Sequence, residues 1–147
     1  MTAEAGSGSG TFGGAVGGTF RRTYARRVAT RLVVKITHAL DDPERAHIGC
    51  NVAAVALAAG LPVDVFLAIE GVRLAEPAVP PQITLAEAPP IGDLLDALYA
   101  GATVTACAPC AARRGLAEAD FREGTRMAGS AAFVEALTAE GATGLVY

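Results

Sequence analysis

The stretch LVVKITHALDDPER, residues 32–45, decides the fold. Its first six residues are mostly apolar and rich in β-branched side chains, a composition typical of a strand that is buried on both faces. Two aspartates, Pro43 and Glu44 then supply a helix cap, a proline suited to the first helical turn and an acid near the helix N-terminus. The sequence therefore predicts a buried strand over residues 32–37, followed by a helix that ends at Gly60.

The same alternation of strand and helix patterns continues to residue 147. Further strands are predicted at 62–69, 103–107, 125–128 and 143–147, and helices at 91–100, within 108–121 and at 130–140. Five prolines in residues 76–90 predict a long ordered loop or lid. Repeated strand–helix–strand units place parallel strands side by side, with helices on both faces. We therefore expect an α/β fold, a three-layer α/β/α domain with a mainly parallel five-stranded sheet.

The N-terminal segment differs in composition from the rest of the chain. Residues 1–18 hold seven of the 17 glycines, and residues 19–31 hold five arginines. With one glutamate, residues 1–31 carry a net charge of +4, which leaves −7 on residues 32–147. We expect 1–31 to be a flexible Gly-rich and Arg-rich arm, solvated rather than bound to nucleic acid, and 32–147 to be the folded domain.

The overall composition excludes several classes of protein. Three cysteines do not make a disulfide framework, and no apolar run approaches the ~18–20 residues that span a bilayer. Aromatic residues are only 5% and tryptophan is absent, which argues against a stacking platform for nucleic acid. We expect a cytoplasmic protein without membrane or nucleic-acid partners. The 32 alanines and few charges suggest contact between subunits through helix faces, hence a homo-oligomer.

The most informative segment is the Cys107-Ala108-Pro109-Cys110 motif at the end of the third strand. Free backbone N–H groups at the start of the following helix, together with Arg113 and Arg114, would favour the thiolate of an exposed Cys107. A thiolate can attack a sulfane sulfur or a disulfide, and a second thiol two residues away can resolve the product. The motif therefore predicts thiol chemistry, with Cys107 as the nucleophile.

A C-x-x-C motif also occurs in thioredoxin-like proteins and in structural zinc sites. Thioredoxin-like proteins need a downstream cis-proline, and this chain has no proline after Pro109. A structural zinc site needs two further ligands, for which His38 and His47 are candidates, but the chain has no second C-x-x-C and no H-x₃₋₅-H pair. Zinc stays an alternative, but we expect neither a metal nor another cofactor.

Other polar residues follow the predicted strands. His38 ends the first strand, where it could orient a substrate, donate a proton or be a solvated loop residue. Glu70 begins a turn that is expected to lie over the site, and Arg113 would steady an anion. His47 is expected at the surface, and Cys50 is expected to pack in the core of its helix.

In order and spacing, these segments resemble the DsrE/DsrF-like proteins over residues 32–147. The matching features are Thr37-His38 with residues 41–46, the alanine-rich helix ending at Gly60, the strand 63–69 with residues 70–72, the strand end at Cys107, residues 114–116, Asp120 and Gly124. The resemblance implies a five-stranded parallel domain, often assembled as trimers or hexamers. It also implies sulfur relay, with a persulfide carried at the position of Cys107.

Cys110 is an addition to the single-cysteine carriers of that family, and it admits a dithiol–disulfide role. The leading hypothesis is a sulfurtransferase-like carrier: Cys107 accepts sulfane sulfur, Cys110 releases the product, and His38, Glu70 and Arg113 surround the site. Its partners would be sulfur donor or acceptor proteins. The alternative is a non-catalytic oligomeric module that binds a small ligand or a partner protein in the same strand-end cleft.

Overall fold

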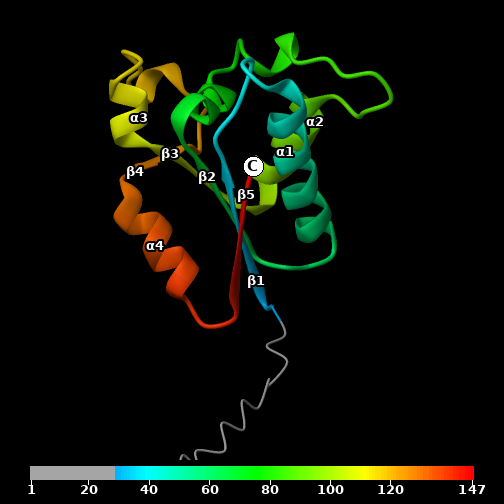
Figure 1. Ribbon diagram of the computed structural model, residues 1–147, viewed down its shortest axis with the longest axis vertical. Coiled ribbons are helices and arrows are strands. Elements are labelled where there is room, and N and C mark those ends of the chain that lie inside the picture. Colours follow the sequence, from blue (N-terminus) through cyan, green and yellow to red (C-terminus); the bar gives the residue numbers. More distant parts are fainter. Residues whose placement is uncertain (1–28) are drawn as a thin grey trace, which may run out of the picture.

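Five parallel strands form a single sheet in the order β4-β3-β2-β1-β5 (Figure 1). The structure is a computed structural model, and it describes residues 29–147. The strands are β1 (Arg31–Ile36), β2 (Val63–Leu67), β3 (Thr103–Cys107), β4 (Arg126–Ala128) and β5 (Ala142–Val146). The chain moves outward from β1 to β4 and then returns to the other side of β1, so the direction of winding reverses beside β1.

Helices cover both faces of this sheet, which gives the predicted three layers. The α-helices are α1 (Pro43–Ala58), α2 (Ile91–Gly101), α3 (Ala108–Ala112) and α4 (Ser130–Thr138). Helices α1 and α2 pack against each other on one face, and α4 lies on the other (Figure 1). Short 3₁₀ turns complete the fold: η1 (Ile69–Ala75), η2 (Pro80–Gln82) and η3 (Glu118–Asp120).

The alternation of side chains along β1 explains how the layers are joined. Leu32, Val34 and Ile36 belong to the buried core that also contains the inner side of α1. Lys35 points to the opposite face, where its ammonium lies 4.9 Å from the centre of the Phe133 ring on α4. Both faces of β1 are therefore covered, as the apolar run predicted.

Helix α1 confirms the predicted cap and the buried cysteine, but it corrects the predicted position of His47. Asp42 is the N-cap and accepts a hydrogen bond from the backbone N–H of Arg45 at 3.2 Å. Cys50 is fully buried, as expected. The prediction that His47 lies at the surface is wrong, because its side chain is buried and its Nε2–H donates to the carbonyl of Pro89 at 2.8 Å. This bond ties the proline-rich loop to α1.

The predicted N-terminal arm falls almost entirely outside the described residues. Residues 1–28 are not described, so the arm stays a prediction. Arg31, which was counted as its last residue, is instead the first residue of β1 and forms an ion pair with Asp64. Among residues 29–147, no helix is both long enough and apolar enough to cross a membrane.

Candidate functional site at the carboxyl end of the sheet

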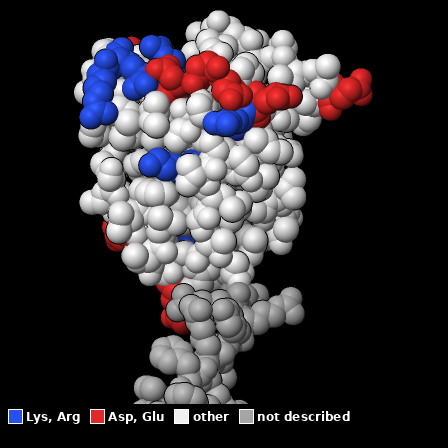
Figure 2. Space-filling model, viewed as in Figure 1, with Lys and Arg blue, Asp and Glu red and all other residues white. Residues whose placement is uncertain are grey.

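Three segments that follow neighbouring strands gather at the carboxyl end of the sheet. They are residues 37–42 after β1, η1 after β2, and Cys107 with α3 after β3. Figure 2 shows that charged side chains crowd this end of the molecule, whereas the middle of the same face has few. Ligands of open parallel sheets bind at this edge, so it is the first place to look for chemistry.

The cysteine pair lies where the sequence predicted, but its sulfur atoms are covered. Cys107 is the last residue of β3, and Cys110 lies in α3. Cys107 is only 5% exposed and Cys110 only 7% exposed. The expectation that Cys107 is open to solvent is therefore wrong for this conformation. Both are free cysteines rather than a disulfide.

Hydrogen bonds and charges favour the thiolate of Cys110. Burial alone would raise the pKa of this thiol, but the Cys107 thiol and the backbone N–H of Ile69 both donate to its sulfur. The positive charges of Arg113 and Arg114 act in the same direction. Together these contacts more than offset burial, so the pKa of Cys110 lies below its ordinary value.

Cys107 has the opposite balance. Burial raises the pKa of its thiol, and the hydrogen bond that it donates to Cys110 raises it further. The backbone N–H of Cys110 and the charge of Lys35 lower it by less. In this coupled pair the pKa of Cys107 is therefore raised and that of Cys110 is lowered. The assignment of Cys107 as the nucleophile stays a prediction.

The N–H group that points at Cys110 is held by an unusual backbone. Ile69 has φ = +55°, a left-handed conformation that a β-branched residue rarely adopts. The flanking chain is fixed on the end of β1, because Ala68 N–H donates to Ile36 O at 2.9 Å and Gly71 N–H donates to Thr37 O at 3.1 Å. These two bonds hold the strained residue in place beside the sulfur.

Glycine is required at position 71 by this close approach. A Cβ atom built on Gly71 would collide with the carbonyl oxygen of Ile36, which is a backbone atom and cannot turn aside. The sequence predicts a turn at Glu70-Gly71, but it does not predict the contact of Ile69 with Cys110. No side-chain type at position 69 could have revealed it, because the interacting group is a backbone N–H.

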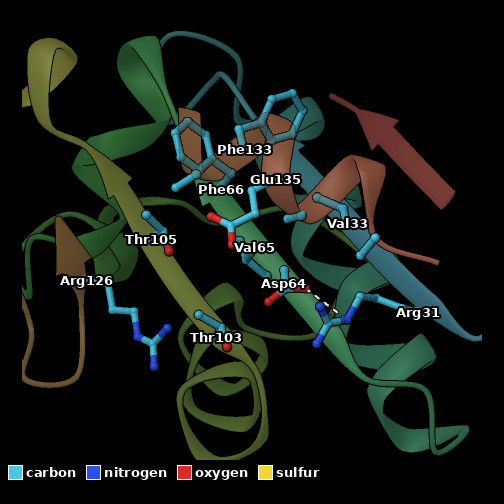
Figure 3. A pocket seen from close by; sticks show the side chains of 13 residues that line it. Arg31, Val33, Asp64, Val65, Phe66, Thr103, Thr105, Arg126, Phe133 and Glu135 are labelled. Atoms are coloured by element: carbon cyan, nitrogen blue, oxygen red, sulfur yellow. Dashed lines mark ion pairs between the residues drawn. The ribbon is translucent and has the colours of Figure 1, made fainter. Parts of the chain in front are cut away.

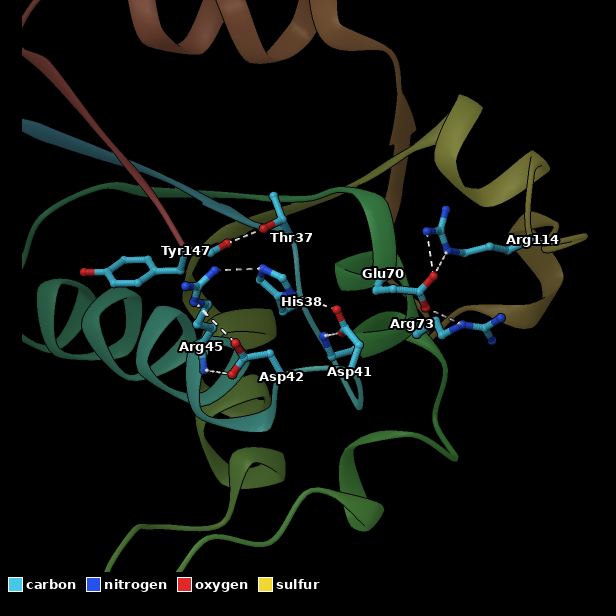
Figure 4. A network of polar contacts seen from close by, with 10 residues as sticks. Thr37, His38, Asp41, Asp42, Arg45, Glu70, Arg73, Arg114 and Tyr147 are labelled. Carbon is cyan, nitrogen blue, oxygen red and sulfur yellow. Dashed lines mark hydrogen bonds and ion pairs between the residues drawn. The ribbon is translucent and has the colours of Figure 1, made fainter.

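Glu70 joins η1 to α3 through an arginine (Figure 4). Its Oε1 accepts from Arg114 at 2.8 Å (Nε) and 2.6 Å (Nη2), while Arg73 donates to its Oε2 at 3.0 Å. The Arg114 bonds, and then Arg73, hold the pKa of Glu70 below its ordinary value. Arg114 also donates to the carbonyl of Cys110 at 3.0 Å. The predicted site residue Glu70 thus fixes the end of the helix that carries Cys110.

His38 belongs to a second polar cluster at the end of β1 (Figure 4). Its Nδ1–H donates to Asp41 at 2.7 Å, and Arg45 approaches its other ring nitrogen at 3.5 Å. Partial burial opposes ionisation of Asp41, but the N–H of Ala39 and the His38 ring hold the pKa of Asp41 below its ordinary value. The structure thus gives His38 neighbours from its own loop and from α1.

Arg113 is exposed at the end of α3, and within residues 29–147 it forms no ion pair. Its positive charge nevertheless helps to lower the pKa of Cys110. The zinc alternative is not supported, because His38 and His47 are bound to different partners. In the described part of the chain, no three His, Cys, Asp or Glu side chains lie close enough together to hold a metal ion.

The fold and this edge of the sheet define a small, all-parallel α/β protein with a cysteine pair after its third strand. Residues 31–143 match the model of the DsrE/DsrF-like family, and the chain belongs to that family, which is generally linked to sulfur relay. The match covers the whole described domain except its last four residues and the two residues that precede β1. The resemblance stated from the sequence is therefore confirmed.

Relatives extend the match without assigning an activity. The chain is 38% identical over 98 residues to an uncharacterized protein from Methanopyrus kandleri, a match that covers 66% of this chain and 78% of that protein. It is also 38% identical over 96 residues to an uncharacterized protein from Methanocaldococcus jannaschii, which covers 65% and 81% of the two chains. Both relatives are uncharacterized, so the match identifies no substrate.

Solved structures confirm the fold. The YchN protein from E. coli superposes with a TM-score of 0.67 at 16% identity, covering 80% of this chain and 99% of that one. A protein of unknown function from Methanobacterium thermoautotrophicum gives 0.63 at 18% identity, covering 80% and 98%.

Proposed function

We propose that this protein exchanges sulfane sulfur with partner thiols through the Cys107–Cys110 pair. The observation that carries the proposal is the position of both cysteines at the carboxyl end of β3, where Arg114 donates hydrogen bonds to Glu70 and to the Cys110 carbonyl and so keeps a positive charge beside Cys110. The lowered pKa of Cys110 agrees with this position. A thiolate is the nucleophile in both sulfur transfer and disulfide exchange. The family's link to sulfur relay supports the same reading.

The chemistry divides the two cysteines by role. The Cys110 thiolate attacks the terminal sulfur of a donor persulfide, R–S–SH. The donor S–S bond breaks, R–S⁻ leaves, and Cys110 carries the persulfide. An acceptor thiolate can then take the outer sulfur, which restores the Cys110 thiolate. This assignment exchanges the roles that the sequence predicted for Cys107 and Cys110.

A second outcome uses Cys107 to resolve the persulfide. After losing its proton, Cys107 attacks the inner sulfur of the Cys110 persulfide, and hydrosulfide leaves. A Cys107–Cys110 disulfide forms, and the sulfane sulfur has gained two electrons. A dithiol reductant must then reopen the disulfide before the next turnover. Because this cycle needs reduced cysteines, we assign the protein to the cytoplasm.

Access to the buried sulfurs requires local movement. Helix α3 is only five residues long, so few backbone hydrogen bonds hold it. Its end is held by Arg114, which bonds both Glu70 and the Cys110 carbonyl. Separation of Arg114 from Glu70 would free α3 from η1 and let a donor persulfide reach Cys110.

Mass spectrometry after loading with a low-molecular-weight persulfide tests the assignment. The adduct is expected on Cys110, absent from Cys110→Ser and retained by Cys107→Ser. Cys50→Ala is the matched control, since burial raises the pKa of Cys50 to about 12 and leaves it inert. Normal persulfide uptake by Cys110→Ser would overturn the proposal.

The burial of both sulfurs favours one alternative, a module that binds a small ligand or partner protein without chemistry. In that case Cys107 and Cys110 resist alkylation in the folded protein as completely as Cys50 does. Alkylation of Cys110 well before Cys50 would exclude the non-catalytic binding module.

The remaining proposal concerns partners: the protein is a homo-oligomer, a trimer or a hexamer, that meets sulfur donor or acceptor proteins. Helix α1 supports the first part because it is apolar on both sides. Its inner side enters the core, while Ile48 and Val55, seven residues apart and thus on one outer stripe, are exposed. An apolar outer stripe of this kind is typical of a subunit contact.

A further inference from the structure

Helix α4 covers only part of its face of the sheet. Its Phe133 ring packs 5.2 Å from the ring of Phe66 on β2, and Leu137 lies against Gly144 on β5. These contacts place the helix over β5, β1 and β2. Beside it, over the first halves of β2, β3 and β4, a cavity of about 370 Å³ remains, which we name the sheet-face cavity (Figure 3).

The floor of the sheet-face cavity is polar, which the fold does not require. Asp64 on β2 lies in register with Thr103 on β3, and Thr105 lies in register with Arg126 on β4. All four side chains line the cavity. Parallel sheets covered by helices normally carry apolar residues on both faces, so this row of polar side chains needs another explanation.

Asp64 carries an unsatisfied atom beside this cavity. Its Oδ2 is buried and accepts no hydrogen bond from any described residue. Arg31 Nε lies 3.4 Å away, close enough for an ion pair but not aligned as a hydrogen bond. Buried carboxylate oxygens without a donor are rare in folded proteins. This oxygen is turned toward Arg31 and away from the open space, while the Asp64 side chain as a whole keeps 20% of its surface exposed and lines the cavity.

Charges of both signs border the same space. Within residues 29–147, Arg126 on β4 and Glu135 on α4 form no ion pair with the protein. Figure 3 shows Glu135 and Asp64 reaching the cavity from α4 and from β2, with the two threonines of β3 between Asp64 and Arg126. Phe66 and Phe133 supply an apolar wall.

From this arrangement we infer that the sheet-face cavity binds a small zwitterion of the amino-acid class with an apolar side chain. The ligand ammonium faces the exposed part of the Asp64 carboxylate and Glu135, while its carboxylate accepts from Arg126. Its side chain lies against the phenylalanine rings. The volume is within the range of small-molecule sites, of which the lower limit is about 300 Å³.

This site is distinct from the cysteine pair. Neither Cys107 nor Cys110 lines the sheet-face cavity, which lies at the amino half of the strands. The inference therefore stands or falls separately from the proposed sulfur chemistry.

Isothermal titration calorimetry on the full chain provides the test. Leucine, methionine and phenylalanine are the probes. N-acetylphenylalanine, which lacks the ammonium charge, and phenylalaninamide, which lacks the carboxylate charge, are the control ligands. We expect binding of at least one amino acid. The two ligands that lack a charge should bind about tenfold more weakly or worse. Each of the variants Asp64→Asn and Arg126→Gln should weaken amino-acid binding by a similar factor. Glu87→Gln, an exposed carboxylate in the proline-rich loop, should leave it unchanged.

Three results would overturn the inference. The first is no binding of any of the three amino acids by folded protein. The second is binding that survives both Asp64→Asn and Arg126→Gln, since the ligand would then lie elsewhere. Arg126 is exposed, so its variant stays informative even if Asp64→Asn disturbs folding. The third is a change in particle mass in these variants without amino-acid binding, which would assign this face to a second copy of the chain.

Discussion

Cys107 and Cys110 are separated by two residues, yet their surroundings favour opposite protonation states. Sequence spacing could identify the pair and its position after a strand, and both were correct. It could not decide which thiol ionises, because one of the groups that lower the pKa of Cys110 is the backbone N–H of Ile69, 41 positions before Cys110. A residue so distant in sequence contributes only through the fold.

A pH experiment tests the role of Glu70 at the same scale. Its pKa is lowered in the folded chain, chiefly by the hydrogen bonds from Arg114. The unfolded chain therefore binds a proton more readily, and stability due to Glu70 is lost as pH falls below about 4.3, the ordinary glutamate value. Glu70→Gln should lower the unfolding midpoint at neutral pH and flatten its decline toward acid. An unchanged acid profile would contradict this role.

At the scale of elements, η1 depends on its close approach to β1. Gly71→Ala places a methyl group on the carbonyl of Ile36, so we expect destabilisation of about 2 kcal/mol or more and a higher Cys110 pKa as Ile69 moves away. Denaturant unfolding and the pH dependence of Cys110 alkylation measure the two effects.

Gly92→Ala in α2 is the matched control for that substitution. A Cβ atom at position 92 meets nothing within 4 Å, and alanine favours helices over glycine by about 1 kcal/mol. Its stability should therefore be unchanged or slightly higher. Equal effects of the two substitutions would show that the approach to Ile36 does not matter.

The proline-rich loop gives a second prediction for an element. His47→Leu removes the hydrogen bond to Pro89 and keeps most of the side-chain volume, at an expected loss of about 1 kcal/mol. Amide hydrogen exchange in residues 82–88 should accelerate, because the loop loses its tie to α1. Val134→Ala, an exposed position on α4, should change stability by no more than about 0.5 kcal/mol and leave exchange in residues 82–88 unaltered. Slow exchange in His47→Leu would mean that prolines alone order the loop.

For the whole molecule, the sequence predicted more of the fold than of the site. Runs such as residues 32–37 identify a buried strand through local chemistry, and capping residues identify helix starts, so element order and the parallel sheet follow. His47 was misplaced because its partner, Pro89, lies in a loop without a periodic pattern. Asp64 was passed over because it occurs within an otherwise apolar strand, although a charge in such a place was the available signal.

Assembly is the prediction at the largest scale. Light scattering should give a mass of three or six times 14.9 kDa. Val55→Glu should lower that mass if α1 forms the contact, whereas Val134→Glu, an exposed valine on α4, should not. A monomer would contradict the proposal, and the reverse response of the two variants would move the contact to α4.

The account depends on Cys110 being the first thiol to lose its proton. An NMR titration of protein labelled with isotopes at the cysteine Cβ atoms measures all three cysteines in one unaltered chain. The account predicts that the pKa of Cys110 lies below the ordinary cysteine value and that of Cys107 above it, and that the pKa of Cys50 is about 12. Ionisation of Cys107 before Cys110, or of both at the ordinary value, would contradict it.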